Sequence, residues 1–213
     1  MEDLSYSSFS KNCASYLAKK KGVTADQEMI LAYAVDVLVI NTANLLATLL
    51  LGWILGVFYG TVASVITVAA FRHTSGGAHS KSPWRCAVVT ILLFPLMAKL
   101  GQYIASLDHI YMTVFSLFSI LVCVICIILW APDDTPSAPI ISSRRRKILK
   151  YLSLLNVAII STIIIFIDSN YAIIKGCLSL SILWVSFILS KPGHNLMSII
   201  DKINLSGERR CKD

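Results

Sequence analysis

Residues 109–130 read HIYMTVFSLFSILVCVICIILW, an apolar run without a single Asp, Glu, Lys or Arg. A bilayer core of about 30 Å needs about 20 mostly apolar residues in a helix, so this run predicts a transmembrane helix. The rest of the chain has the same character, because 56% of its 213 residues are hydrophobic and its mean hydropathy is +0.71. Soluble globular domains are less apolar than this. The sequence therefore predicts an all-α, polytopic membrane protein.

Apolar runs on both sides of this stretch complete the predicted membrane domain, which covers residues 30–190. The first region is long enough for two helices, with a break available near Gly52, Gly56 and Gly60. Six transmembrane helices are predicted in total: two within 30–71, then 86–107, 109–130, 151–167 and 172–190.

The segments outside the membrane domain are predicted to be an interfacial helix at residues 1–29 and a cytoplasmic tail at residues 191–213. The N-terminal segment places apolar side chains at roughly helical intervals ahead of a run of lysines, which favours a helix lying on the inner leaflet. No cleavable signal peptide is evident, because this segment lacks an apolar core. Thr24 followed by Gln27 predicts a capping box at the start of the next helix.

The orientation follows from the basic residues, which favour the cytoplasmic side of a membrane. With the N-terminus inside, 17 of the 19 Lys and Arg residues fall in cytoplasmic segments, and only Lys99 and Lys175 do not. The N-terminus, the loop at 72–86 and the C-terminus are then all cytoplasmic. The net charge of +7 is explained by this topology and by attraction to anionic lipid, so no nucleic-acid partner is expected.

The segment FRHTSGGAHSKSPWRC at residues 71–86 is a polar, glycine-containing loop between apolar runs. It carries His79 and Cys86, two side chains able to do chemistry near neutral pH. Cysteine becomes a strong nucleophile only as a thiolate, and a neighbouring imidazole or a helix N-terminus favours that form. The Gly76-Gly77 pair allows a sharp fold-back that would bring His79 towards Cys86. These features indicate a catalytic loop.

The residues before Cys86 predict a helix start. Ser82 is a suitable N-cap and Pro83 suits the first helical position, which places Arg85 and Cys86 in the first turn. The positive end of the helix dipole there favours an anionic sulfur, and Arg85 adds positive charge.

Less specific interpretations compete with this one. Most cysteines in membrane helices are packing residues, and this is the preferred interpretation of Cys123 and Cys126. His73, His79 and Cys86 could instead be metal ligands. A small transporter or channel would use polar residues within the spans, namely Asp36, Asn44 and Lys99.

Residues 131–150 are predicted to form a second cytoplasmic loop. Its two acidic residues, Asp133 and Asp134, are interpreted as solvated turn residues slightly in preference to partners of His79 or of a basic substrate. Lys99 could reach the interface, pair with an acid or bind a substrate carboxylate, and the sequence leaves these three open. No cofactor and no metal are expected.

Taken together, these residues resemble the AgrB-type peptidases, the accessory gene regulator B proteins of Gram-positive quorum-sensing systems. The resemblance rests on Gly-Gly-Ala-His79 followed after six residues by Cys86, on Arg72 before them, and on their place between the second and third of six helices. A second match is Ala131-Pro132-Asp133-Asp134-Thr135, followed by a proline and a basic run. The resemblance covers nearly the whole chain, although residues 1–30 match in character more than in motif.

The resemblance implies a cysteine endopeptidase in the bacterial cell membrane. Such enzymes cleave a membrane-bound pro-peptide of the AgrD type near its C-terminus and help to close the remaining peptide into a thiolactone or lactone ring. By matching position, Cys86 would be the nucleophile and His79 the base. Supporting roles would fall to Arg72, Gly76, Gly77, Arg85, Asp133 and Asp134. The expected partners are the pro-peptide and the lipid bilayer, and a homodimer is left open.

Overall fold

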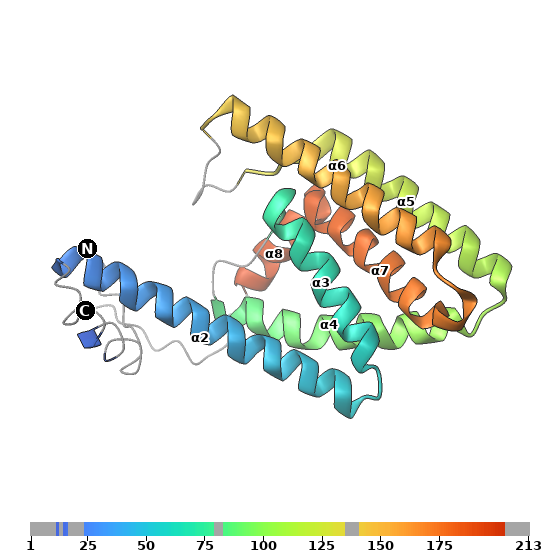
Figure 1. The fold of residues 1–213 in the computed structure, drawn as a ribbon, viewed down its shortest axis with the longest axis horizontal. Coiled ribbons are helices and arrows are strands. Elements are labelled where there is room, and N and C mark those ends of the chain that lie inside the picture. The colour runs from blue at the N-terminus through green and yellow to red at the C-terminus, as the bar shows by residue number, and fades with distance from the viewer. Residues whose placement is uncertain (1–11, 13–14, 17–23, 79–82, 135–140, 203–213) are drawn as a thin grey trace. The chain divides into compact units, whose positions relative to one another are not determined.

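The computed structural model describes residues 12, 15–16, 24–78, 83–134 and 141–202. The elements, in chain order, are α2 (Ala25–Ile54), α3 (Phe58–Thr74), α4 (Pro83–Ala105), α5 (His109–Trp130), α6 (Ser143–Phe166), the 3-10 turn η1 (Ser169–Tyr171), α7 (Ala172–Leu189) and α8 (Lys191–Lys202) (Figure 1). No β-strand occurs among the described residues, so the predicted all-α class is confirmed. The chain divides into two compact units, residues 1–47 and 48–213, and the boundary falls inside α2.

Five helical segments are long and apolar enough to cross a membrane: Asp26–Ile54, Trp84–Ala105, His109–Trp130, Ser143–Phe166 and Ser169–Leu189. The polytopic character predicted from the sequence is therefore confirmed. The remaining predicted span corresponds to α3, which has only 17 residues. Because a bilayer core needs about 20 residues, the count of six spans stays a prediction. The break between the first two helices falls at residues 55–57, inside the predicted glycine region.

The first unit contains the N-terminal part of α2. Its start has the predicted capping box: the Thr24 N–H donates to Gln27 Oε1 at 3.0 Å, and the Gln27 N–H donates to Thr24 Oγ1 at 3.5 Å. The Ser15 hydroxyl donates to the Glu28 carboxylate. Most of the predicted interfacial helix at residues 1–29 lies outside the described residues.

The second unit is arranged around α7, which contacts α3, α4, α5, α6 and α8 (Figure 1). Small residues make this possible, because they allow helix backbones to approach closely in an apolar surrounding. At the crossing with α4, a Cβ added to Gly176 would lie 2.8 Å from the Gly101 carbonyl oxygen. The buried hydroxyls of Ser181 and Ser186 are satisfied within α7 itself, by the carbonyls four residues earlier.

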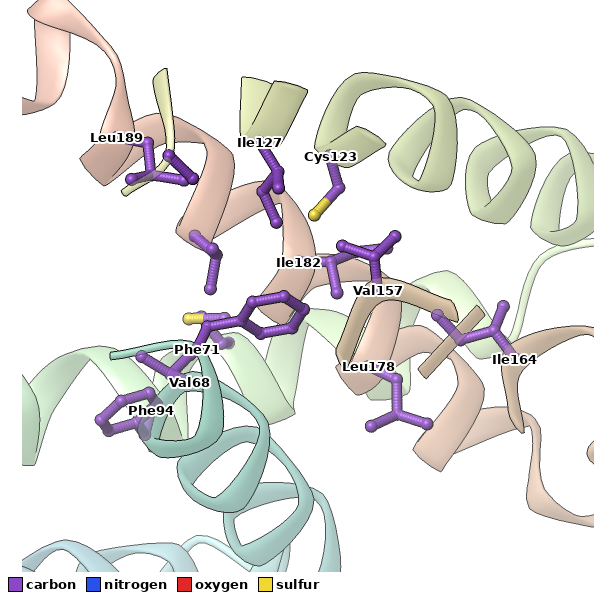
Figure 2. Packing of buried hydrophobic residues seen from close by; sticks show 13 residues of the cluster. Val68, Phe71, Phe94, Cys123, Ile127, Val157, Ile164, Leu178, Ile182 and Leu189 are labelled. Carbon is purple, nitrogen blue, oxygen red and sulfur yellow. The ribbon is translucent and has the colours of Figure 1, made fainter. Parts of the chain in front are cut away.

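One extended apolar cluster joins α3, α4, α5, α6 and α7 (Figure 2). Phe71 of α3, Ile127 of α5, Ile164 of α6 and Ile182 of α7 are almost completely buried in it. Cys123 is also fully buried there, which confirms its interpretation as a packing residue. Because Phe71 lies one turn before the end of α3, the cluster fixes the point from which the polar loop departs.

The sequence interpretation did not assign a helix to the tail, and the structure contains one. Residues 191–202 form α8, which packs against α7. Its buried or half-buried side chains, Met197 and Ile200, lie three residues apart, and Leu196 adjoins them. This amphipathic pattern explains why α8 packs against α7. With 12 residues, α8 is too short to cross a membrane.

Candidate functional site

The polar loop between α3 and α4 has two described arms, residues 75–78 and residues 83–86. His79 and the predicted N-cap Ser82 lie outside the described residues. Cys86 lies on the second arm. The structure therefore shows the contacts of the residues that precede His79 and of the helix start that carries Cys86.

The first arm contains the glycine pair. Gly76 and Gly77 have φ values of +73° and +116°, in the region that residues with a side chain rarely adopt. A Cβ on Gly76 would lie 2.7 Å from the Asp133 carbonyl oxygen, and one on Gly77 would lie 3.1 Å from the Ile188 side chain. The pair therefore has the backbone conformation that favours glycine, and the arm lies against two other parts of the chain, whereas the predicted approach of His79 to Cys86 involves residues outside the described part.

Backbone hydrogen bonds hold the first arm in that position. The Asp133 N–H donates to the Ser75 carbonyl at 2.9 Å, and the Ala78 N–H donates to the Ile188 carbonyl at 2.9 Å. The arm is thus attached both to the segment after α5 and to the end of α7. Ala78, the residue before His79, is buried.

The last turn of α3 is held by a residue that the sequence analysis missed. Asn156, half-buried on α6, donates through Nδ2 to the Ala70 carbonyl at 3.2 Å and to Thr74 Oγ1 at 3.1 Å. The available signal was a lone amide in an apolar run, which in membrane helices typically marks a helix–helix contact. Its sequence position gave no indication of which helix it would bind.

The second arm opens α4, and its helix begins at Pro83 as predicted. Cys86 therefore lies in the first turn, where backbone N–H groups have no partner within the helix and the dipole favours negative charge. The Cys86 side chain is neither buried nor fully exposed. A thiol in this position is accessible to a substrate and lies at the positive end of the helix dipole.

Arg85, the residue before Cys86, is engaged by the far end of α8. Its guanidinium donates to the Asp201 carbonyl and lies 3.9 Å from the Asp201 carboxylate. Both side chains are largely withdrawn from solvent, at 15% and 18% exposure. Asp201 was not identified from the sequence, because nothing in the tail pattern connects it with a loop 116 residues earlier.

The two acidic residues after α5 behave differently from each other. Asp134 is exposed and pairs with Arg146 at the start of α6, as a surface turn residue would. Asp133 is bound through its backbone to Ser75, and its carboxylate Oδ2 lies 3.0 Å from Nε2 of His194 on α8. The interpretation as a solvated turn residue is therefore wrong for Asp133. Gly76 is the cause, since the absence of its side chain lets the two segments come into contact.

The other candidate residues of the second unit are Arg72, His73 and Lys99. Arg72 and His73 are exposed on the last turn of α3. Lys99 is exposed on α4, where its ammonium donates to the Leu55 carbonyl at 3.4 Å and to Gln102 Oε1 at 3.2 Å. Neither contact corresponds to one of the three roles left open for Lys99; together they link α4 to the residue that follows α2. Asp36 and Asn44 belong to the first unit.

Metal ligation depends on a suitable cluster of donor side chains. Within the part of the chain that the structure describes, no group of three or more His, Cys, Asp or Glu side chains is placed to hold a metal ion. The alternative set of His73, His79 and Cys86 includes a residue outside that part.

Comparison with known proteins adds an independent observation. The family model Accessory gene regulator B matches residues 10–189. An AgrB-like protein of Clostridium acetobutylicum is 26% identical over 151 residues, which is 71% of this chain and 69% of that protein. Accessory gene regulator protein B of Staphylococcus aureus strain MRSA252 is 28% identical over 158 residues, covering 74% of this chain and 81% of the relative.

No solved structure matches the chain. The family match covers most of the sequence, including both arms of the loop, Asp133 and all of α7. The all-α fold and its long apolar helices agree with the resemblance noted from the sequence. The chain belongs to the accessory gene regulator B family.

Proposed function

We propose that this protein is a membrane cysteine endopeptidase that cleaves an AgrD-type pro-peptide on the C-terminal side of its signal segment and promotes ring closure of the product. Cys86 is the nucleophile and His79 is the general base and acid. The observation that carries the proposal is the position of Cys86 in the first turn of α4, seven residues after His79 in a loop whose two arms are both anchored.

The reaction follows from this pair. The Cys86 thiolate attacks the scissile carbonyl and forms a C–S bond, and the carbonyl electrons move to oxygen. When the tetrahedral intermediate collapses, the peptide C–N bond breaks, and the His79 imidazolium gives its proton to the leaving amine. The enzyme then holds the N-terminal part of the peptide as a thioester on Cys86.

Ring closure uses a thiol or hydroxyl of the peptide itself. That group loses its proton to His79 and attacks the thioester carbonyl, and the C–S bond to Cys86 breaks to return the enzyme thiolate. A thiol nucleophile exchanges one thioester for another, so this step is nearly isoenergetic. Water competes for the same thioester, and a site that excludes water favours the ring over hydrolysis. An amphipathic pro-peptide lying on the inner leaflet would meet the loop at the depth predicted for it.

The direct test is cleavage of the pro-peptide by membranes or purified protein carrying Cys86→Ala or Cys86→Ser. Both variants are expected to lose cleavage while inserting normally, because serine keeps the shape of cysteine but is a much weaker nucleophile. Cys126→Ala is the matched control, since Cys126 is a buried packing residue on α5. Full cleavage by Cys86→Ala would refute the proposal.

A further inference from the structure

α8 lies directly beyond residues 10–189, the part of the chain that matches the family. It follows α7 after one residue, Ser190, through a very tight turn. A Cβ on Gly193 would lie 2.2 Å from the Phe187 carbonyl oxygen and 2.7 Å from Ile188 Cα. Only glycine allows the start of α8 to fold back this closely on the end of α7, so the direction of α8 is fixed at its first turn.

The inward face of α8 packs against the first arm of the loop. Gly193, Met197 and Ile200 lie at helical spacing on this face. Met197 is buried in a small cluster with Ile188 and with Ala78, the residue that immediately precedes His79. Since the Ala78 N–H also donates to the Ile188 carbonyl, the chain entering His79 is held between α7 and α8.

The far end of α8 holds the second arm. Asp201 binds the Arg85 guanidinium through its carbonyl, with its carboxylate 3.9 Å away, and Arg85 immediately precedes Cys86. Both side chains are mostly withdrawn from water. Removing one partner of such a pair leaves the other poorly solvated, so the contact resists separation.

A third contact joins the first turn of α8 to Asp133, whose backbone binds Ser75. Nε2 of His194 lies 3.0 Å from the Asp133 carboxylate, and the Asp133 N–H binds the Ser75 carbonyl. One short helix thus contacts Ala78 before His79, Arg85 before Cys86, and Asp133, which binds Ser75.

We propose that α8 is a positioning element of the catalytic loop, in which Met197 holds the arm of His79 and Asp201 holds the arm of Cys86. The proposal rests on the proposed function of this pair. Proton transfer between them requires hydrogen-bond distance, and a misplacement of 1 Å can cost about 100-fold in rate. Because α8 contacts both described arms, it sets the relative position of Ala78 and Arg85, the residues that immediately precede His79 and Cys86.

The test compares Met197→Ala and Asp201→Asn with two substitutions on the exposed side of the same helix, Ser198→Ala and Lys202→Gln. Two properties of the full-length protein in detergent are measured: kcat and KM for pro-peptide cleavage, and the rate at which iodoacetamide alkylates Cys86 at neutral pH. Alkylation at Cys86 is read by peptide mass spectrometry, and His79→Ala gives the rate without the imidazole.

Met197→Ala is expected to lower kcat at least about tenfold with little change in KM, since substrate binding is not its role. Asp201→Asn is expected to lower kcat by less, because it keeps the main-chain carbonyl that Arg85 binds and loses only the carboxylate charge 3.9 Å from the guanidinium. The same variants should slow Cys86 alkylation towards the rate of His79→Ala. Met197→Leu, which nearly keeps the side-chain volume, should leave kcat and the alkylation rate near their wild-type values. Asp201→Glu, which keeps the negative charge, should do the same. Ser198→Ala and Lys202→Gln should behave as wild type.

The proposal is overturned if Met197→Ala and Asp201→Asn alkylate at the wild-type rate, or if Ser198→Ala and Lys202→Gln slow it equally. It is also overturned if the losses disappear at a temperature well below the melting point, because α8 would then act only through stability. Failure of the proposed peptidase function gives a different pattern, in which Cys86→Ala still cleaves the pro-peptide. In that case the alkylation rates of the α8 variants still show whether α8 controls the surroundings of Cys86.

Discussion

Gly76 shows how a single residue joins two segments that are distant in the sequence. Its φ of +73° requires a left-handed backbone, and its missing side chain leaves the Asp133 carbonyl in contact. Gly56 has nearly the same φ, +70°, but a Cβ there would meet nothing within 4 Å. A comparison of alanine substitutions at the two glycines therefore distinguishes the free-energy cost of a left-handed backbone from the cost of a steric clash with Asp133.

Gly56→Ala and Gly76→Ala are both expected to lower the free energy of unfolding by about 1–2 kcal/mol, the usual penalty for a left-handed residue with a side chain. Gly76→Ala should in addition displace the segment at Asp133 and lower kcat for cleavage, whereas Gly56→Ala should keep kcat. Thermal unfolding in detergent and cleavage rates measure the two effects. Equal kcat values for the two variants would show that this contact does not matter to the site.

The assignment of the base is also a question at the scale of single residues. His79→Ala is expected to lower the rate of acylation by about 100- to 10,000-fold, the usual contribution of a general base. His73→Ala should retain most activity, because His73 is exposed on the last turn of α3. Single-turnover cleavage measures both. Equal effects of the two substitutions would remove the basis for choosing His79, and loss of cleavage with a strong chelator would favour the metal-ligand alternative.

At the scale of elements, α7 combines packing with support of the site. Its first half crosses α4 at Gly176 and Gly101, and its last turn presents the Ile188 carbonyl to Ala78. A displacement of α7 by a substitution at the crossing would therefore reach the loop through a continuous helix.

Gly176→Ala is expected to lower the free energy of unfolding by about 1–3 kcal/mol, because the added methyl group meets the Gly101 backbone, which cannot rotate away. Thr162→Ala, on an exposed position of α6, is the matched control and should have a small effect. The melting temperature in detergent is the measurement. Similar melting temperatures for Gly176→Ala and wild type would mean that the α4–α7 crossing is looser than described.

The elements also show what could be predicted from the sequence. Apolar runs, the capping box at Thr24 and the helix start at Pro83 are local signals, and each was predicted with its position nearly right. Asn156, His194 and Asp201 were missed because their partners lie more than 60 residues away in the chain. Such pairings depend on how helices pack, and no local pattern encodes them. The positions of Arg85 and Cys86 were predictable, whereas the partner of Arg85 was not.

At the scale of the whole molecule, the distribution of basic residues predicts which ends of the helices face the cytoplasm. Asn170, in the turn before α7, is exposed and should be outside, and Lys202, at the end of α8, should be inside. In a variant whose cysteines are replaced by serine, Asn170→Cys is expected to react with a membrane-impermeant maleimide in intact cells. Lys202→Cys should react only after permeabilisation. The opposite pattern would invert the topology and place the loop on the outer face.

In the proposed reaction, the peptide passes through a covalent thioester on Cys86. The most direct measurement is the intact mass of the purified enzyme after mixing with a pro-peptide whose ring-forming nucleophile is replaced by alanine, so that the acyl group cannot leave by cyclisation. A mass increase equal to the free N-terminal fragment less one water is expected, located on Cys86 and absent from Cys86→Ala. Ring formation from the unmodified pro-peptide by the Cys86→Ala variant would contradict it.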